Sequence, residues 1–446
     1  MIQTFVNAWK VPELRKKMLF TLMIILLYRI GANLVIPYVN VAYMEVRNEL
    51  FSDGIFGLLS MMSGDAFSKA TFFALSVSPY ITASIVIQLL SIAIPALERM
   101  SKDEDGKKKL SAATRWVTVA LAIVTAFGYV NLLNQNKLLT TAATPATGSA
   151  KHVLPWIVMI ACLCAGASLI MWLAEKINEH GIGNGISIIL FANIISGMTG
   201  YIQGAISMLK DSSTLKWLTG WDLVFGILGV ILSIALALAA IVLIVWFTNS
   251  ERRIKVIYAK RVVGRKTYGG QKTNLPLKMN MAGVMPVIFA SSIVSIPAMI
   301  AGFIPNSGFA HFVTHWINSD RAIYFVVFVA LIVAFSYFYI AISFNPVEVA
   351  NNIRSNGGAI IGIRPQEMAP FIKKILNRVT LMGAIFLVII AGVPIIATAV
   401  ATMLEIRFTS LAFAGTSLLI AVGVALELVR DLEAQLSMRN YKGFLD

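Results

Sequence analysis

This sequence of 446 residues has few of the side chains on which most enzymes depend. It contains only two cysteines, four histidines, and 22 Asp and Glu residues, and 13% of its residues are charged. Cys162 and Cys164 lie two positions apart in an apolar stretch, so their side chains point to different faces. No disulfide framework is predicted, and we interpret both as small core residues.

The motifs of common catalytic chemistry are also absent from the sequence. No Walker sequence occurs, so the chain has no phosphate-binding loop with which to use ATP. No Gly-x-Ser-x-Gly elbow is present. His311 and His315 have the i, i+4 spacing of a metal-binding helix, but no glutamate follows His311 and no third ligand is evident. We therefore predict no enzyme activity, metal site or cofactor.

Long hydrophobic runs dominate instead, and 58% of the residues are hydrophobic. Runs long enough to cross a bilayer indicate a polytopic helical membrane protein whose two termini lie on the same side. The predicted spans are 19–37, 71–95, 116–133, 153–174, 186–209, 223–247, 283–304, 322–343, 379–400 and 408–429.

The distribution of Lys and Arg predicts the orientation. With the N-terminus inside, 28 of the 37 basic residues fall in cytoplasmic segments and 8 in external loops, with Arg29 inside the first span. Residues 1–18 precede the first span and are predicted to form a short amphipathic helix at the cytoplasmic interface. Arg29 is either a functional residue or a packing residue that pairs with carbonyl groups of a neighbouring helix.

A short apolar piece precedes the second span and is too short to cross the membrane. The stretch from Gly54 to Gly64 reaches about half-way through a hydrocarbon core of roughly 30 Å. Irregular backbone at this depth is tolerated where it lines a cavity, so we interpret the piece as a stopper inside a pore. On the second span, Ile81, Ile85 and Gln88 share one helical face, which we predict to be the wall on which the stopper rests.

Residues 249–280 form the longest cytoplasmic loop and carry nine basic residues against the single acid Glu251. Alternation from Arg252 to Lys260 predicts a β-ribbon, with a glycine-rich turn at 269–270. Such a ribbon would protrude as a basic arm suited to RNA phosphates or an acidic protein surface. The alternative is that its charges reflect only the positive-inside rule.

Two further patterns concern the spans. The stretch 181–187 is rich in glycine but lacks the ending of a phosphate loop, so it predicts a tight turn with positive φ values. The second and seventh spans both carry an early proline and small polar residues, and each is second in its half. That placement is expected for two inverted five-span halves that meet at interrupted helices.

Several stretches resemble signatures of the SecY family, the central subunits of protein-translocation channels. They are Ser78-Pro-Tyr-Ile-Thr-Ala-Ser-Ile-Val-Ile-Gln-Leu-Leu90, Glu175-Lys-Ile-Asn-Glu-His-Gly-Ile-Gly-Asn-Gly-Ile-Ser187, Asn280-Met-Ala-Gly-Val-Met-Pro-Val-Ile-Phe-Ala-Ser-Ser292, Gly362-Ile-Arg-Pro365 and Phe413-Ala-Gly-Thr-Ser-Leu-Leu-Ile-Ala-Val-Gly423. Gln366 stands where the family usually has glycine.

The resemblance implies a fold and a set of functional residues. The expected fold is an all-α polytopic membrane protein, with ten transmembrane helices in two inverted halves around an hourglass pore closed by a short plug half-helix. The implied pore ring comprises Ile81, Ile85, Ile186, Leu190, Ile288 and Ile420. The implied plug comprises Ile55, Phe56, Gly57, Leu58, Leu59, Ser60, Met61, Met62, Ser63 and Gly64. The implied lateral gate comprises Ser84, Gln88, Ser291 and Ser292. The implied contacts for a motor or ribosome are Arg252, Arg253, Lys260 and Arg364.

By the same resemblance, the chain is expected to be a passive protein-conducting channel of the bacterial inner membrane. It would translocate secretory polypeptides, release transmembrane segments sideways into the bilayer, and work with SecE, SecG, the SecA ATPase and the ribosome. The expected division is 1–18, a first half 19–209 with the plug at 54–67, a second half 210–429 with cytoplasmic loops 249–280 and 344–378, and a tail 430–446.

The residues alone leave two other function classes open. A secondary transporter also has inverted repeats and broken helices, but would usually need a buried coupling carboxylate, and the span interiors offer none away from their ends. An intramembrane protease would need a serine or histidine whose replacement abolishes activity.

Overall fold

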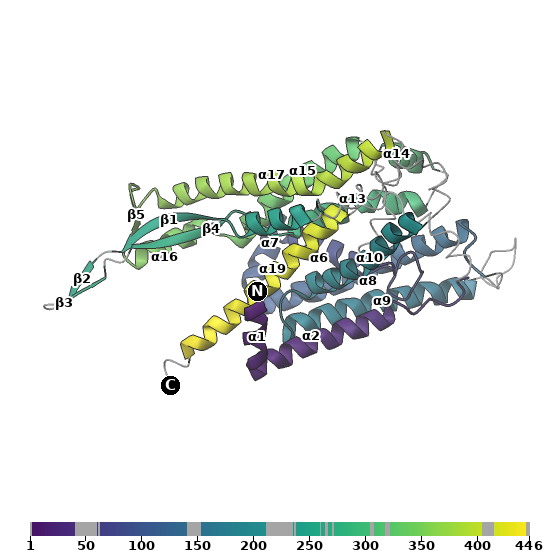
Figure 1. Cartoon of the computed structure of the whole chain (residues 1–446), viewed down its shortest axis with the longest axis horizontal. Helices are drawn as coiled ribbons and strands as arrows, with labels where there is room; N and C mark the ends of the chain where they lie inside the picture. The colour runs from purple at the N-terminus through teal and green to yellow at the C-terminus, as the bar shows by residue number, and fades with distance from the viewer. Residues whose placement is uncertain are drawn as a thin grey trace.

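The structure is a computed structural model. It describes residues 2–40, 60, 63–140, 153–210, 235, 238–258, 260–263, 266–269, 272–303, 307–316, 322–403 and 414–442. Long helices run roughly along the longest axis of the molecule, and a small sheet lies at one end (Figure 1). The helices are α1 (Ile2–Lys10), α2 (Pro12–Gly31), α6 (Ser78–Ala93), α7 (Pro95–Lys102), α8 (Glu104–Gln135), α9 (Val153–His180), α10 (Gly185–Lys210), α13 (Met285–Phe303), α14 (Gly308–Trp316), α15 (Ala322–Ser343), α16 (Pro346–Ser355), α17 (Met368–Met403) and α19 (Ala414–Lys442). The strands are β1 (Glu251–Tyr258), β2 (Lys260–Val263), β3 (Lys266–Gly269), β4 (Lys272–Lys278) and β5 (Gly358–Ile360).

Five of the ten predicted spans lie within these helices: 116–133, 153–174, 186–209, 322–343 and 379–400. Among the described residues, four helical stretches are long and apolar enough to cross a membrane: 104–135, 153–180, 323–355 and 368–392. A fifth candidate is the pair α6 and α7, which bends by 107° at a break before Pro95. The eighth span, predicted at 322–343, coincides with α15. Part of the sixth span appears as a helix from Leu238 to Thr248.

The prediction for the start of the second span was wrong. Residues 71–77 are not helical, and α6 begins at Ser78 with Pro79 in its first turn, where a proline needs no N–H partner. The preceding segment has left-handed backbone at Gly64, Asp65, Ala70 and Ser76. It is tied to neighbouring elements by backbone hydrogen bonds at 36–70 and 34–72. Irregular backbone at membrane depth is thus satisfied inside the protein, as the cavity interpretation requires.

The basic arm is a ribbon, but its turn is not where the sequence placed it. β1 pairs with β4 from Glu251↔Lys278 to Ile257↔Lys272, and β2 pairs with β3 from Lys260↔Gly269 to Val263↔Lys266. The chain therefore reverses between 263 and 266, and the prediction of a turn at 269–270 was wrong. Gly269 instead ends a strand opposite Lys260, where the two parts of the ribbon join.

The two large cytoplasmic loops of the prediction form one unit, which the sequence did not reveal. β5, from the loop 344–378, pairs with β1 and completes a sheet of order β4–β1–β5. Beneath this sheet lies a separate hydrophobic core made by the strands, α16 and the start of α17. Its fully or nearly buried members are Ile254, Val256, Leu277, Ala350, Ile353, Ile360, Met368 and Ile372.

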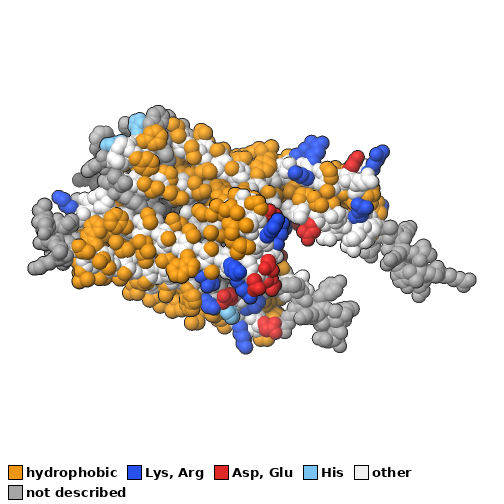
Figure 2. All heavy atoms as spheres, turned by 180° about the vertical axis from the view of Figure 1, so that it is seen from behind, with side chains coloured by type: hydrophobic (Ala, Val, Ile, Leu, Met, Phe, Trp, Pro, Cys, Tyr) orange, Lys and Arg blue, Asp and Glu red, His pale blue; other side chains and the backbone are white. Residues whose placement is uncertain are grey.

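The N-terminal segment is two helices rather than one. α1 ends at Lys10 and α2 starts at Pro12, because the residue before a proline is disfavoured in helical conformation. Ala8 is fully buried with Leu432 of α19, and the Thr4 hydroxyl donates to Glu433 at 3.1 Å. α1, the distal end of α19 and the strands lie toward the same end of the molecule, opposite α14 (Figure 1). On the face seen in Figure 2, most charged side chains gather toward that end, and apolar side chains make up much of the remaining described surface.

Candidate pore and gate

The candidate pore ring is assembled from four helices. Ile81 and Ile85 lie on α6, Leu190 on α10, Ile288 on α13 and Ile420 on α19, and each is at most 5% exposed. All five belong to the largest hydrophobic cluster among the described residues, and Ile186 of α10 packs against it partly buried. The structure therefore places all six predicted ring residues in or against one large hydrophobic cluster, which also contains aromatic side chains, although they span more than 300 positions of the sequence.

The base of the predicted plug packs tightly beside this cluster. Of the ten plug residues, only Ser60, Ser63 and Gly64 lie within the described part of the chain; Ile55, Phe56, Gly57, Leu58, Leu59, Met61 and Met62 lie outside it. Ser63 is fully buried, donates to the Ser60 carbonyl at 2.8 Å and accepts from the amide of Phe67 at 3.0 Å. These bonds tie Ser63 to residues on both sides of Gly64.

Gly64 is where the plug base meets the first and fifth spans. Its φ is +63°, and a Cβ atom there would lie 3.0 Å from both the Cα and the carbonyl oxygen of Asn193, and 3.2 Å from Nη1 of Arg29. Arg29 in turn donates to the carbonyl of Ala192 on α10. The second interpretation of Arg29 is confirmed, since it pairs with a carbonyl of a neighbouring helix.

Asn193 is a residue of this site that the sequence reasoning missed. It is fully buried, and its side-chain amide donates to the Ser76 hydroxyl at 3.3 Å. A signal was available, because Asn193 lies three and seven positions after Leu190 and Ile186 and so continues their helical face. A buried amide on the ring-bearing face of α10 marks the place where that helix supports the irregular segment before α6.

The candidate lateral gate lies between α6 and α13, which pack against each other. Ser84 and Gln88 on α6 are partly buried, whereas Ser291 and Ser292 on α13 are 7% and 1% exposed. The hydroxyls of both α13 serines donate to the carbonyl of Ile288 on their own helix, at 2.9 and 2.8 Å. The α13 serines therefore make these bonds within their own helix, so opening the gate does not break them.

A mostly apolar pocket opens along the same boundary. It lies between the plug base, α6, α8 and α13, and it reaches the ring at Leu190. It is lined by Phe67, Ala74, Leu75, Ser76, Ser78, Pro79, Thr82, Leu121, Val124, Thr125, Leu190, Ile296 and Ile300. Packing between these helices is thus incomplete beside the ring, where a lateral opening would have to form.

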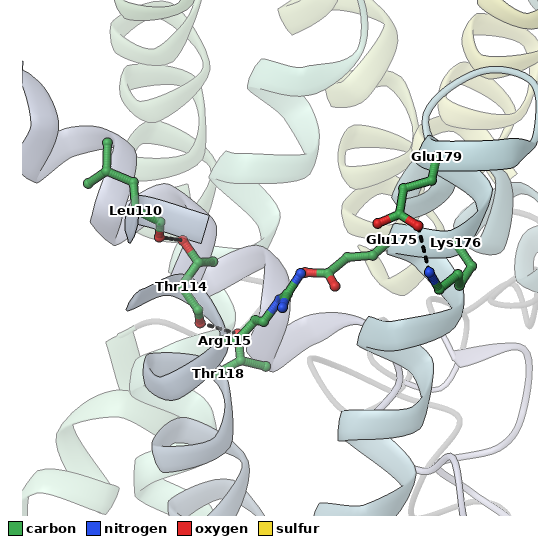
Figure 3. A network of polar contacts seen from close by, with 7 residues as sticks. All are labelled: Leu110, Thr114, Arg115, Thr118, Glu175, Lys176 and Glu179. Atoms are coloured by element: carbon green, nitrogen blue, oxygen red, sulfur yellow. Dashed lines mark hydrogen bonds and ion pairs between the residues drawn. The ribbon is translucent and has the colours of Figure 1, made fainter. Parts of the chain in front are cut away.

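An ion pair joins the third and fourth spans outside the apolar region. Arg115 of α8 points across to Glu175 of α9 and donates to its carboxylate at 2.9 Å (Figure 3). This bond, with the charge of Glu175, holds the pKa of Arg115 above its ordinary value. Next to it, Lys176 donates to Glu179 at 2.6 Å. Sequence reasoning did not find the Arg115–Glu175 pair, since its members are 60 positions apart.

The predicted docking residues lie at the strand-bearing end. Arg252 and Arg253 are exposed on β1, and Arg364 is exposed in the turn that follows β5. β1 and β5 are neighbouring strands of one sheet, so both loops contribute arginines to it, although the side chains of Arg252 and Arg253 leave opposite faces of β1. Lys260 lies on β2, and its side chain is outside the described part of the structure. Gln366 is exposed in the same turn as Arg364.

Comparison with known proteins agrees with this geometry. The family model for SecY matches residues 71–429. Protein translocase subunit SecY of Streptomyces galbus is 42% identical, and that of Mycobacterium tuberculosis is 38% identical, each over the full length of both chains. A solved structure described as a protein conducting channel has a TM-score of 0.62 at 18% identity, with 96% of each chain covered. Sec61 in a canine ribosome–channel complex has a TM-score of 0.59 at 16% identity, again covering 96% of each.

The apolar helices and the likeness to solved protein-conducting channels define a polytopic helical channel of the membrane. The chain belongs to the SecY family, whose members are subunits of the protein translocase. It is therefore a channel subunit for the translocation of proteins across a membrane. The ten-span layout expected from the sequence is the layout of this family.

Proposed function

We propose that polypeptides cross the membrane in an unfolded state through the ring of Ile81, Ile85, Ile186, Leu190, Ile288 and Ile420. The observation that carries this proposal is the convergence of these aliphatic residues, from four helices, in one buried cluster beside the plug base. A narrow aliphatic collar excludes ions by dewetting, and it offers a sliding peptide no polar group to hold it. The chain itself then acts as a passive pore rather than an enzyme.

The plug and the lateral gate would control the two exits of this pore. The plug at 54–67 would seal the external side and pivot at Gly64, where the backbone turns. Separation of α6 from α13 would open the pore to lipid, so that apolar segments leave sideways according to their own hydrophobicity. The α13 serines support this proposal because their hydroxyls bond within their own helix. The two five-span halves, 19–209 and 210–429, would move apart about this boundary.

The driving force would come from a partner on the cytoplasmic arm. We infer that Arg252, Arg253, Lys260 and Arg364 dock either the SecA ATPase or ribosomal RNA, because exposed arginines on one sheet suit phosphates and carboxylates alike. SecE and SecG would complete the channel. We place the complex in the bacterial inner membrane with both termini cytoplasmic, on the strength of the Lys and Arg distribution.

Site-specific crosslinking tests the ring. Single cysteines are placed at Ile85 and at Ile288 in a chain whose Cys162 and Cys164 are replaced, and a secretory polypeptide carrying one cysteine is stalled during translocation. The matched control is a cysteine at Val326, which is 64% exposed on α15. Disulfides to the stalled chain from Ile85 and Ile288, and none from Val326, are the expected result. A stalled chain that crosslinks equally to all three positions, or to Val326 alone, would refute the ring.

A further inference from the structure

Arg430 connects the last helix to the foot of the cytoplasmic arm. It lies on α19, and its Nη2 atom donates to the carbonyl of Thr248 at 2.7 Å and to the side-chain oxygen of Asn249 at 3.0 Å. Thr248 is the last residue of the sixth-span helix and is 6% exposed. A cation at this position satisfies a terminal carbonyl and opposes the negative end of the helix dipole.

The arm starts immediately after this contact. β1 begins at Glu251, and the chain returning from β4 donates from the amide of Met279 to the carbonyl of Ser250 at 2.9 Å. β1 therefore begins two residues after Asn249, and the residue that follows β4 is hydrogen-bonded to the residue next to Asn249. A tilt of the ribbon about its foot would have to strain or break the bonds of Arg430.

The same helix carries a ring residue and touches the gate helix. Ile420, Gly423, Glu427 and Arg430 follow each other at spacings of three, four and three, so they share one face of α19. A Cβ atom at Gly423 would lie 2.2 Å from Cγ1 of Val284, so α19 passes very close to the residue just before α13. Arg430 is about 15 Å along the helix from Ile420, at roughly 1.5 Å per residue.

Arg430 also lies near the returning strand of the ribbon. Lys278 is the last residue of β4 and stands opposite Glu251 in the register of the ribbon. Burial and the nearby charge of Arg430 both hold the pKa of Lys278 below its ordinary value. The same side chain therefore caps the sixth-span helix and lies beside the last residue of β4.

We propose that Arg430 is a positioning residue that couples the cytoplasmic arm to the pore. It makes the arm and α19 move as one body, so that a displacement imposed on the arm by a docked partner reaches Ile420 and, through the contact of Gly423 with Val284, the start of α13. This inference rests on the proposed docking role of the arm.

The test uses the assembled translocase in proteoliposomes with purified SecA and a secretory substrate. Arg430→Gln removes the charge, Arg430→Lys keeps a cationic donor, and Asn249→Ala removes only the second bond. Arg15→Gln, at an exposed position on α2, is the matched control. Two quantities are measured for each variant: the affinity for SecA, and the translocation rate at saturating SecA. Loss of a hydrogen bond to a charged group lowers the ratio of arms bound by Arg430 to arms released from it by about tenfold.

The expected result is a translocation rate that falls about tenfold in Arg430→Gln, with less loss in Asn249→Ala and in Arg430→Lys, while SecA affinity stays unchanged. Spin labels at Lys255 on β1 and at Ala434 on α19 provide a readout that does not depend on activity. Their distance distribution should broaden in Arg430→Gln and not in Arg15→Gln.

Two results would overturn the coupling. One is a normal rate at saturating SecA, and the other is a label distribution that does not change. Failure of the docking proposal is recognised separately, from a double variant Arg252→Glu, Arg253→Glu that binds both SecA and ribosomes normally. Normal docking in that double variant would remove the premise, whatever Arg430 does.

Discussion

Replacing Gly64 by alanine should make the resting channel leak ions. The residue has a φ of +63°, and an added Cβ atom would lie 3.0 Å from two backbone atoms of Asn193. Left-handed backbone costs an L-residue with a side chain roughly 1–2 kcal/mol relative to glycine. The backbone of Asn193 belongs to α10 and cannot yield as a flexible side chain would, so the plug base must shift instead.

The size of the effect follows from this strain. If the strain is relieved when the plug leaves its seat, the ratio of open to closed channels rises about 5- to 30-fold, since that is what 1–2 kcal/mol amounts to. The assay is ion conductance of the purified translocase in planar bilayers without substrate. Gly197→Ala on α10 is the control, because no atom of the described residues lies within 4 Å of its added Cβ and its φ is ordinary.

One result would refute the reasoning about Gly64. A Gly64→Ala channel that conducts no more than Gly197→Ala would mean that the plug base tolerates a side chain, and so that its seat against Asn193 does not hold the plug closed. Equal leak in both variants would refute it as well, because Gly197 does not touch the plug base.

Three further predictions concern the core beneath the sheet, the Arg115–Glu175 pair and Lys278. Met368→Ala empties a fully buried position beneath the sheet and should cost that unit about 2–5 kcal/mol, seen as faster hydrogen exchange of β1 and β4. Glu175→Gln breaks the pair with Arg115, which is half exposed, and should lower stability by no more than about 1 kcal/mol in thermal unfolding. Arg430→Gln should raise the pKa of Lys278 by removing a like charge, so that labelling of Lys278 by an amine reagent shifts to higher pH.

Each of these has an outcome that contradicts it. Unchanged exchange in β1 would mean that the sheet does not depend on its core. A large loss of stability in Glu175→Gln would mean that the pair carries more than a surface interaction. A labelling curve of Lys278 that stays in place would mean that burial alone accounts for its lowered pKa.

Local patterns in the sequence were sufficient for the elements themselves. Apolar length predicted the eighth span at 322–343, and α15 has those bounds, because a helix in lipid must be apolar for as long as the hydrocarbon is thick. Period-2 alternation predicted the ribbon of β1 and β4, because successive side chains of a β-strand point to opposite faces of the sheet. The i, i+4 spacing put Ile81 and Ile85 on one face, and that face is buried.

Contacts between distant parts of the chain were not readable in this way. No local pattern in the sequence predicts that β5 pairs with β1 or that Arg115 pairs with Glu175. The same is true of the hydrogen bond from Arg430 to Thr248, which are 182 positions apart. In the sequence, Gly423 looks like any other small residue, and only the structure shows that Val284, just before α13, packs against it. The start of α6 was misplaced because hydropathy reports only how apolar a stretch is. Residues 71–77 are mostly apolar and yet non-helical, since turns within the segment and the residues that follow α2 satisfy their backbone.

The sequence by itself therefore determined most of the apolar segments, the buried face of α6, the presence of a basic ribbon and, through its resemblances, the family. Only the tertiary structure decided that the six aliphatic residues meet in one core, where the plug base is seated, and that Arg430 contacts the end of the sixth-span helix. The physical reason is that hydrophobicity and periodicity are properties of each segment. The packing of the core, the contact of the plug base with α10 and the contact of Arg430 depend instead on distances between segments.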